Sequence, residues 1–169
     1  AIEILKSLLT RPAQHDALRA RYLDFREQHG QRPTATELFH EGFAPRSLKR
    51  SHGSWLDFVQ SMGDLSPAQQ EAQKKAREFL TNLETTPMTR SYKMLTLQAM
   101  LDADAFPGSI GIEDLVDGFA RLAGRSAVLS KDVTVALNER KALIRLLEAN
   151  PIKAWTGDGS ATSFFTYQD

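Results

Sequence analysis

The chain has 169 residues, no cysteine and a formal net charge of zero at pH 7, with 41% hydrophobic and 25% charged residues. These values are typical of a soluble globular protein with one domain or two small ones. They exclude disulfides, thiolate metal sites and a strongly basic nucleic-acid coat, although a local basic patch is compatible with zero net charge. No apolar run is long enough to cross a bilayer, and there is no signal peptide, so we expect a cytoplasmic protein without a membrane partner.

Residues 1–65 predict a first module of short helices. Pro12 is expected to close an initial helix, and Leu18, Tyr22 and Phe25 then recur at helical spacing. Gly30 is expected to end that helix. The chain starts at an alanine instead of an initiator methionine, which we interpret as a piece of a longer protein.

Two helix starts inside this module carry capping signals. Thr34 followed by Glu37 is a capping box, and that short helix is expected to stop at Gly42. Ser54 is expected to cap a second helix, and Gly63 to end it. One face of this second helix is apolar, which predicts core packing for its members Trp55, Phe58, Val59 and Met62.

A basic segment lies between these two helices, with no acidic residue from Ala44 to Leu56. Pro45 is expected to open a helical turn. Arg46, Lys49 and Arg50 on this turn would neutralise phosphates. Ser47 and Ser54 are candidates for hydroxyl or amide contacts to the phosphates. His52 is a candidate for a contact with the DNA backbone. The structural alternative is that the basic segment is a solvated surface turn. In that case the His52 side chain supports the turn before Gly53 and contacts no ligand.

The run from Tyr22 to Leu65 as a whole resembles a known repeat. It contains Gly30-Gln31-Arg32-Pro33-Thr34, then the basic turn, then Gly53-Ser54-Trp55. These features are similar to the short repeat found beside homing endonucleases and in some bacterial superfamily 2 helicases. The resemblance implies a helix-turn-helix-like unit that binds DNA.

Residues 66–86 predict a connecting helix, opened by Ser66 and Pro67 and broken at Thr85-Thr86-Pro87. Its apolar stripe consists largely of small side chains. We therefore place a module boundary near Pro87.

Residues 87–169 predict a winged-helix-like module. We expect a helix at 91–102, a short strand at 110–112, and two helices at 113–123 and 133–149. A C-terminal β-hairpin is expected from 152–155 and 163–167. Asn150-Pro151 is expected to stop the last helix. The overall expectation is a mostly α protein with a helix-turn-helix-like repeat followed by this second module.

The second module also resembles a known segment. The motifs are Pro87-Met88-Thr89-Arg90-Ser91-Tyr92-Lys93-Met94, Asn150-Pro151-Ile152 after a long helix, and Phe164-Phe165. They are similar to the C-terminal region of large bacterial DEAD/DEAH-type helicases, which often carry the first kind of repeat just upstream. The two resemblances together imply an accessory region whose partners are duplex DNA and the helicase motor domains of the parent chain.

Two further features of the second module have a functional and a structural interpretation. Lys93 opens a helix and would hold a phosphate with the helix amides, whereas the structural alternative makes it a solvent-facing cation. The second feature is an acidic cluster of Asp102, Asp104, Glu113, Asp114 and Asp117, which would bind Mg²⁺ or serve a nuclease. The structural alternative is that Glu113 and Asp114 begin a helix, where the helix dipole favours negative charge.

Catalysis by this chain is not expected. It contains neither a Gly-x-x-x-x-Gly-Lys-Ser/Thr phosphate loop nor an Asp-Glu-Ala-His box. The histidines are spaced too widely for a helical metal pair, so we expect no catalytic residue, metal or cofactor. The sequence therefore predicts an accessory DNA-binding region that docks on the backbone. The alternatives are a non-catalytic protein-interaction or structural module and, third, a small nuclease.

Overall fold

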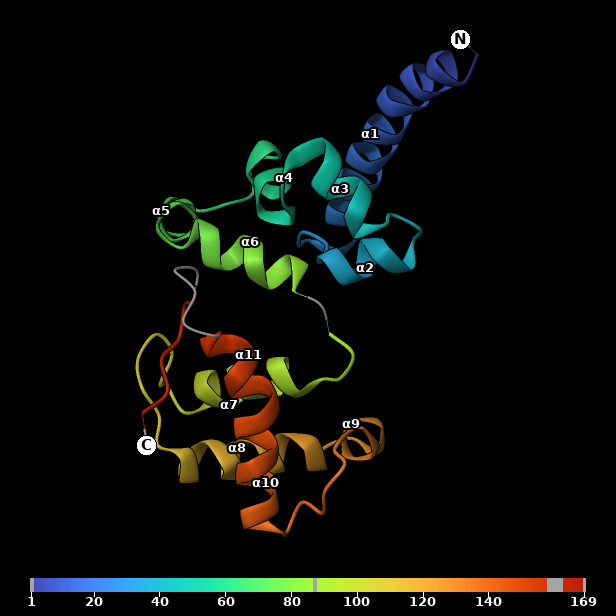
Figure 1. The fold of residues 1–169 in the computed structure, drawn as a ribbon. Helices are drawn as coiled ribbons and strands as arrows, with labels where there is room; N and C mark the ends of the chain where they lie inside the picture. The colour runs from blue at the N-terminus through green and yellow to red at the C-terminus, as the bar shows by residue number, and fades with distance from the viewer. Residues whose placement is uncertain (1, 87, 158–162, 169) are drawn as a thin grey trace. The chain divides into compact units, whose positions relative to one another are not determined.

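The computed structural model describes residues 2–86, 88–157 and 163–168, and for residues 2–15 and 45–47 it describes the backbone alone. Helices form nearly all of the regular structure, and no β-strand occurs within these ranges (Figure 1). The prediction of a mostly α protein is therefore confirmed. The chain forms two compact units, a first unit of Ala1–Thr86 and a second unit of Pro87–Asp169.

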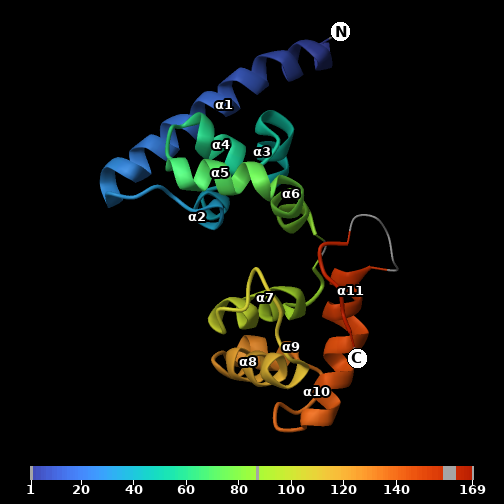
Figure 2. The same ribbon diagram turned by 90° about the vertical axis from the view of Figure 1, so that its left-hand side faces the viewer.

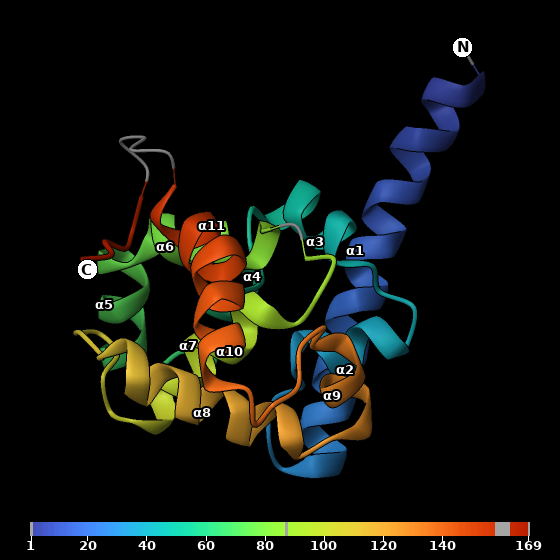
Figure 3. The same ribbon diagram turned by 60° about the horizontal axis from the view of Figure 1, so that its bottom comes forward.

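The first unit places several short helices against the C-terminal half of one long helix. The long helix is α1, and Figures 1 and 3 show its N-terminal half extending beyond the others. It continues through Pro12, so the prediction that Pro12 ends a helix was wrong: a proline removes one hydrogen bond, and the flanking turns continue here. The helices are α1 (Ile2–His29), α2 (Ala35–His40), α3 (Pro45–His52), α4 (Trp55–Ser61), α5 (Pro67–Lys75) and α6 (Arg77–Thr85).

The core of the first unit forms where the apolar faces of α1 to α4 meet. Tyr22 is fully buried, and its ring lies edge-on to Phe58 at 5.3 Å between centroids. Leu38 of α2 and Leu48 of α3 belong to the same cluster. Trp55 is half-buried and packs against this cluster, 5.7 Å from the Phe58 ring, so it lies at the edge of the core.

The predicted capping signals are confirmed. The Thr34 hydroxyl accepts from the Glu37 N–H while the Glu37 carboxylate accepts from the Thr34 N–H, and Ser54 caps α4. Ser66 forms a capping box with Gln69 at the start of α5. The single connecting helix predicted for 66–86 is instead two helices, since Ala76 leaves helical geometry at φ −105° and ψ 19°.

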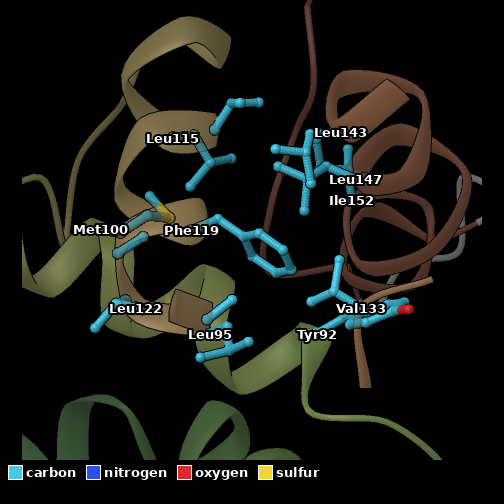
Figure 4. Packing of buried hydrophobic residues seen from close by; sticks show 13 residues of the cluster. Tyr92, Leu95, Met100, Leu115, Phe119, Leu122, Val133, Leu143, Leu147 and Ile152 are labelled. Carbon is cyan, nitrogen blue, oxygen red and sulfur yellow. The ribbon is translucent and has the colours of Figure 1, made fainter. Parts of the chain in front are cut away.

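The second unit consists of helices packed around Phe119, which is fully buried (Figure 4). Leu143, Leu147 and Ile152 approach its ring from one side, and Met100 lies on the other. The elements are α7 (Tyr92–Asp102), α8 (Ile112–Gly124), α9 (Ala127–Asp132), α10 (Arg140–Leu147), a π-helical turn η1 (Glu148–Ile152) and α11 (Lys153–Thr156). The helices predicted at 91–102 and 113–123 correspond to α7 and α8.

The long helix predicted for 133–149 was wrong in its first half. Residues 133–139 are not helical, and α10 begins only at Arg140. Tertiary hydrogen bonds explain the difference: the Tyr92 hydroxyl donates to the Asp132 carbonyl at 2.8 Å, and the Thr134 N–H donates to that hydroxyl at 3.2 Å. A helix that begins at Val133 would use the Asp132 carbonyl as its first acceptor and would leave the Thr134 N–H without a helical partner. The Tyr92 hydroxyl binds both groups and holds the segment in a non-helical conformation.

The predicted strand at 110–112 was also wrong. Ile112 is the first residue of α8, and the Gly111 carbonyl accepts from the Leu115 N–H at 3.0 Å. Both isoleucines pack against the core from a turn and a helix start. The pattern of two isoleucines around Gly111 is compatible with the start of a helix as well as with a short strand.

The C-terminal β-hairpin, and with it the winged-helix-like module, was wrong for the described residues. Asn150-Pro151 does not stop the helix: α10, η1 and α11 form one nearly continuous rod (Figure 2). Pro151 and Ile152 are buried, as is Trp155, because the wide π turn keeps this face against the core. Residues 163–168 have no regular structure, and the predicted hairpin turn at Gly157–Ser160 lies mostly outside the described residues.

Candidate nucleic-acid interface

Helix α3 is delimited by two glycines with left-handed backbone, Gly42 at φ +95° and Gly53 at φ +88°. Pro45 is its first residue, which suits a position where no N–H is needed. A side chain at Gly53 would be strained by this φ and would meet the Asp57 carboxylate at 3.0 Å. The sequence thus fixes a short basic helix between two sharp turns.

Two of the predicted contact residues are exposed cations on this helix. Leu48 is buried against the core, and the neighbouring Lys49 and Arg50 are exposed. Neither cation lies within 4 Å of a carboxylate among the residues whose side chains are described. Arg46 and Ser47 lie on the same helix, but their side chains fall outside the described part of the chain.

Two other arginines of the first unit, Arg21 and Arg26, differ from these two cations because they are paired. Arg21 binds Glu41 and Asp24, and this hydrogen bonding lowers the pKa of Glu41 below its ordinary value. Arg26 binds Asp64 at 2.6 Å. Cations paired in this way offer less net charge to a phosphate, so α3 is the helix best suited to an anionic ligand.

His52 and Ser54 lie at the turn that connects α3 to α4. The His52 ring is half-buried, with its centroid 4.8 Å from that of Phe58. Ser54 is buried, and its hydroxyl accepts from the Asp57 N–H at 2.9 Å. Both side chains therefore support the position of α3 in this arrangement.

The start of α4 is already occupied by polar side chains of the protein. The Trp55 N–H donates to the Glu84 carboxylate at 3.0 Å. Asp57 accepts from Gln73 at 3.0 Å and from Arg77 at 2.9 Å. Since these carboxylates give the turn negative charge, backbone amides here do not form an anion site. Sequence reasoning missed this network because its members are 16 to 29 residues apart.

Lys93, the remaining predicted contact residue, lies on α7 in the second unit. It is half-buried, and its Nζ lies 5.7 Å from the centroid of the Trp155 ring. The Trp155 Nε1–H donates to the Lys93 carbonyl at 3.4 Å. Lys93 is therefore not part of the basic surface of α3 and lies instead beside an aromatic ring of the second unit.

The acidic cluster of the second unit is largely neutralised. Arg140 binds both Glu113 and Asp117 and also donates to the Glu113 carbonyl at 3.0 Å. Asp102 has Arg121 at 3.6 Å and Arg125 at 4.0 Å. Within the described ranges, no group of three or more histidine, aspartate or glutamate side chains is placed to hold a metal ion. The arrangement indicates ion pairs on a helix surface.

A feature that sequence reasoning missed is a cavity in the second unit. Its lining combines α7, the turn before α8, α11 and the C-terminal segment, including Met100, Ile110, Trp155 and Phe165. The volume is about 250 Å³. Phe164-Phe165 was the available signal, but a cavity whose lining includes residues as far apart as 96 and 167 cannot be predicted from local patterns.

Comparison with known proteins yields no relative: the chain matches no protein-family model, no curated protein and no solved structure. Within the described ranges, no helix has the length and apolar character needed to cross a membrane.

Proposed function

We propose that the first unit docks on duplex DNA through α3, as an accessory region of a larger bacterial helicase in the cytoplasm. The observation that carries this proposal is the pair Lys49 and Arg50: both are exposed, and neither has an ion-pair partner among the described side chains. No carboxylate occurs on α3 itself. The resemblance of Tyr22–Leu65 to a DNA-binding repeat supports the same assignment.

Docking on the phosphate backbone is the mechanism that these side chains favour. Lysine and arginine that neutralise phosphates release condensed counterions, which makes binding strong at low salt and insensitive to sequence. The rest of the turn supplies rigidity. Leu48 seats α3 in the core, and Ser54 fixes the start of α4. A helix held in this way presents its cations at a constant spacing.

The accessory role follows from what the chain lacks. No phosphate-binding loop occurs in its sequence, and three of the five acidic residues that would serve a nuclease, Asp102, Glu113 and Asp117, are paired with arginines. We therefore assign ATP hydrolysis and strand movement to motor domains of the parent chain. The present region would hold the duplex against that motor, a non-catalytic task.

A salt titration of duplex binding tests this proposal. The double substitution Lys49→Ala with Arg50→Ala should reduce the magnitude of the log–log salt slope by about 2, since each phosphate that a cation neutralises adds about 0.9 to it. The matched control is Arg19→Ala with Lys74→Ala, two exposed cations on α1 and α5 for which, like Lys49 and Arg50, no ion pair is found among the described side chains. Circular dichroism should show both variants folded, because surface cations contribute little stability. Equal slopes for wild type and the α3 variant would refute the assignment.

The second candidate function is a protein-interaction module that packs on the motor. The observation favouring it is Phe39 on α2, a large apolar side chain that is 52% exposed. Under this alternative, Phe39→Ser would weaken binding to the motor domains and leave duplex affinity unchanged. Loss of motor binding without any DNA binding by the wild type would favour this candidate over DNA docking.

A further inference from the structure

The cavity of the second unit has aromatic walls. The Phe165 ring lies 5.5 Å from the Trp155 ring and 6.0 Å from that of Phe106, between centroids. Phe164 and Tyr167 also line the cavity, and each is 38% exposed, so the aromatic surface reaches solvent. Aromatic faces of this kind bind flat ring systems by stacking.

The size of the cavity suits a single ring system. A cavity of about 150 Å³ with an apolar lining accepts benzene. At about 250 Å³, this cavity has room for a ring with substituents. It lies just below the range of about 300–1,000 Å³ that is typical of small-molecule sites, so a long or branched ligand would not fit inside.

Two hydroxyl groups of the lining, those of Thr96 and Thr156, favour a ligand that donates hydrogen bonds. The Thr96 hydroxyl donates to the Tyr92 carbonyl at 2.9 Å, and the Thr156 hydroxyl donates to the Ile152 carbonyl at 2.9 Å. With their hydrogens committed, these hydroxyls offer oxygen acceptors to a ligand. Nucleobases carry ring or exocyclic N–H groups that match such acceptors.

A positive charge stands next to the aromatic wall. Lys93 lies on α7, one turn before Leu97 of the cavity lining, and its Nζ is 5.7 Å from the Trp155 ring. A base attached to a phosphate would meet an aromatic surface and a cation together. This combination is typical of proteins that bind single strands, where aromatic stacking and backbone charge act jointly.

We propose that this cavity of the second unit binds one unstacked base of single-stranded DNA. Trp155, Phe164 and Phe165 provide the aromatic surface, and Lys93 provides the cation for the adjoining phosphate. The site is distinct from the duplex contact of α3 and concerns a different form of the nucleic acid. A region with both sites would hold duplex at one unit and an unpaired strand at the other.

The test measures binding of fluorescently labelled dT12 to the full chain by anisotropy. Phe164→Ala should weaken this binding by at least about fivefold, the effect of losing about 1 kcal/mol or more of stacking. Lys93→Gln should reduce the magnitude of the salt slope by about 0.7, the value for one contact to a single strand. The controls are Val128→Ala, an apolar position 77% exposed away from the lining, and Lys131→Gln on α9.

The outcomes separate this inference from the duplex proposal. Weaker dT12 binding by Phe164→Ala and Lys93→Gln, with wild-type binding by both controls, would support it even if α3 proves not to bind duplex. Wild-type affinity for dT12 in both cavity variants would overturn it. Absence of dT12 binding by the wild type would also overturn it, and if Phe164→Ala then impairs binding to motor domains, the cavity serves a protein. Lys93→Gln decides the question if Phe164→Ala fails to fold by circular dichroism.

Discussion

Each unit contains a buried tyrosine in its core, but the two hydroxyls have different partners. Tyr22 lies edge-on to Phe58 and donates to the Asp64 carboxylate at 2.7 Å, where Arg26 also binds. Tyr92 lies edge-on to Phe119 and joins two backbone groups of residues 132 and 134. The first hydroxyl links side chains and the second fixes a loop. The same packing unit therefore ties α1 to the end of α4 in one case and organises a non-helical segment in the other.

The largest expected effect comes from removing the aromatic ring beneath each tyrosine. Phe58→Ala and Phe119→Ala should each destabilise their own unit by about 3–5 kcal/mol, because both rings are fully buried. Hydrogen exchange by mass spectrometry would locate the damage. We expect faster exchange in 1–86 for the first variant and in 87–169 for the second. Faster exchange throughout the chain in either variant would show that the two units unfold together.

A smaller effect should separate the two hydroxyls. Tyr92→Phe leaves the Thr134 N–H without its partner and should cost about 1–3 kcal/mol. Tyr22→Phe should cost less, about 0.5–1.5 kcal/mol, because Asp64 keeps the Arg26 guanidinium as a donor. Urea denaturation of the two variants measures the difference. Equal losses would mean that the loop does not depend on the Tyr92 hydroxyl.

The smallest effect is an alkaline loss of stability in the first unit. Burial, followed by the hydrogen bond to Asp64, raises the pKa of Tyr22 well above its ordinary value near 10. A raised pKa in the folded state means that the stabilisation is complete below about pH 10 and declines as the pH rises above it. The decline is at most about 1.4 kcal/mol per pH unit. Denaturation at pH 9 and pH 11 should show it in the wild type and show less of it in Tyr22→Phe, and an identical decline in both proteins would contradict the assignment.

Local capping signals in the first unit were reliable. Thr34 and Glu37 form the capping box that their spacing predicts, and Ser66 caps α5 as predicted, because each signal involves residues within one turn. The exposure of Lys49 and Arg50 could also be predicted, since a basic segment between two glycines has few ways to be buried. The DNA contact itself stays a prediction.

The predictions that were wrong depended on distant partners. The helix predicted to begin at Val133 is absent there because Tyr92, some forty residues earlier in the chain, binds its first backbone groups. The hairpin was predicted from apolar residues on either side of a glycine-rich turn, but Ile152 and Trp155 face the core from a helix. The cavity joins residues from four segments, so no window of the sequence contains it.

The π-helical turn at Glu148–Ile152 also says something about how this chain tolerates change in length. A π turn spans one residue more than an α turn, and each residue rotates an α-helix by about 100°. Removing one residue from this turn would convert it to an ordinary α turn while keeping Trp155 in the same angular phase relative to Leu147. The turn is thus equivalent to an α-helix that has absorbed a single-residue insertion. Deletion of one residue here is therefore expected to leave the indole on the same side of the helical rod, provided that the buried Pro151 still fits the turn.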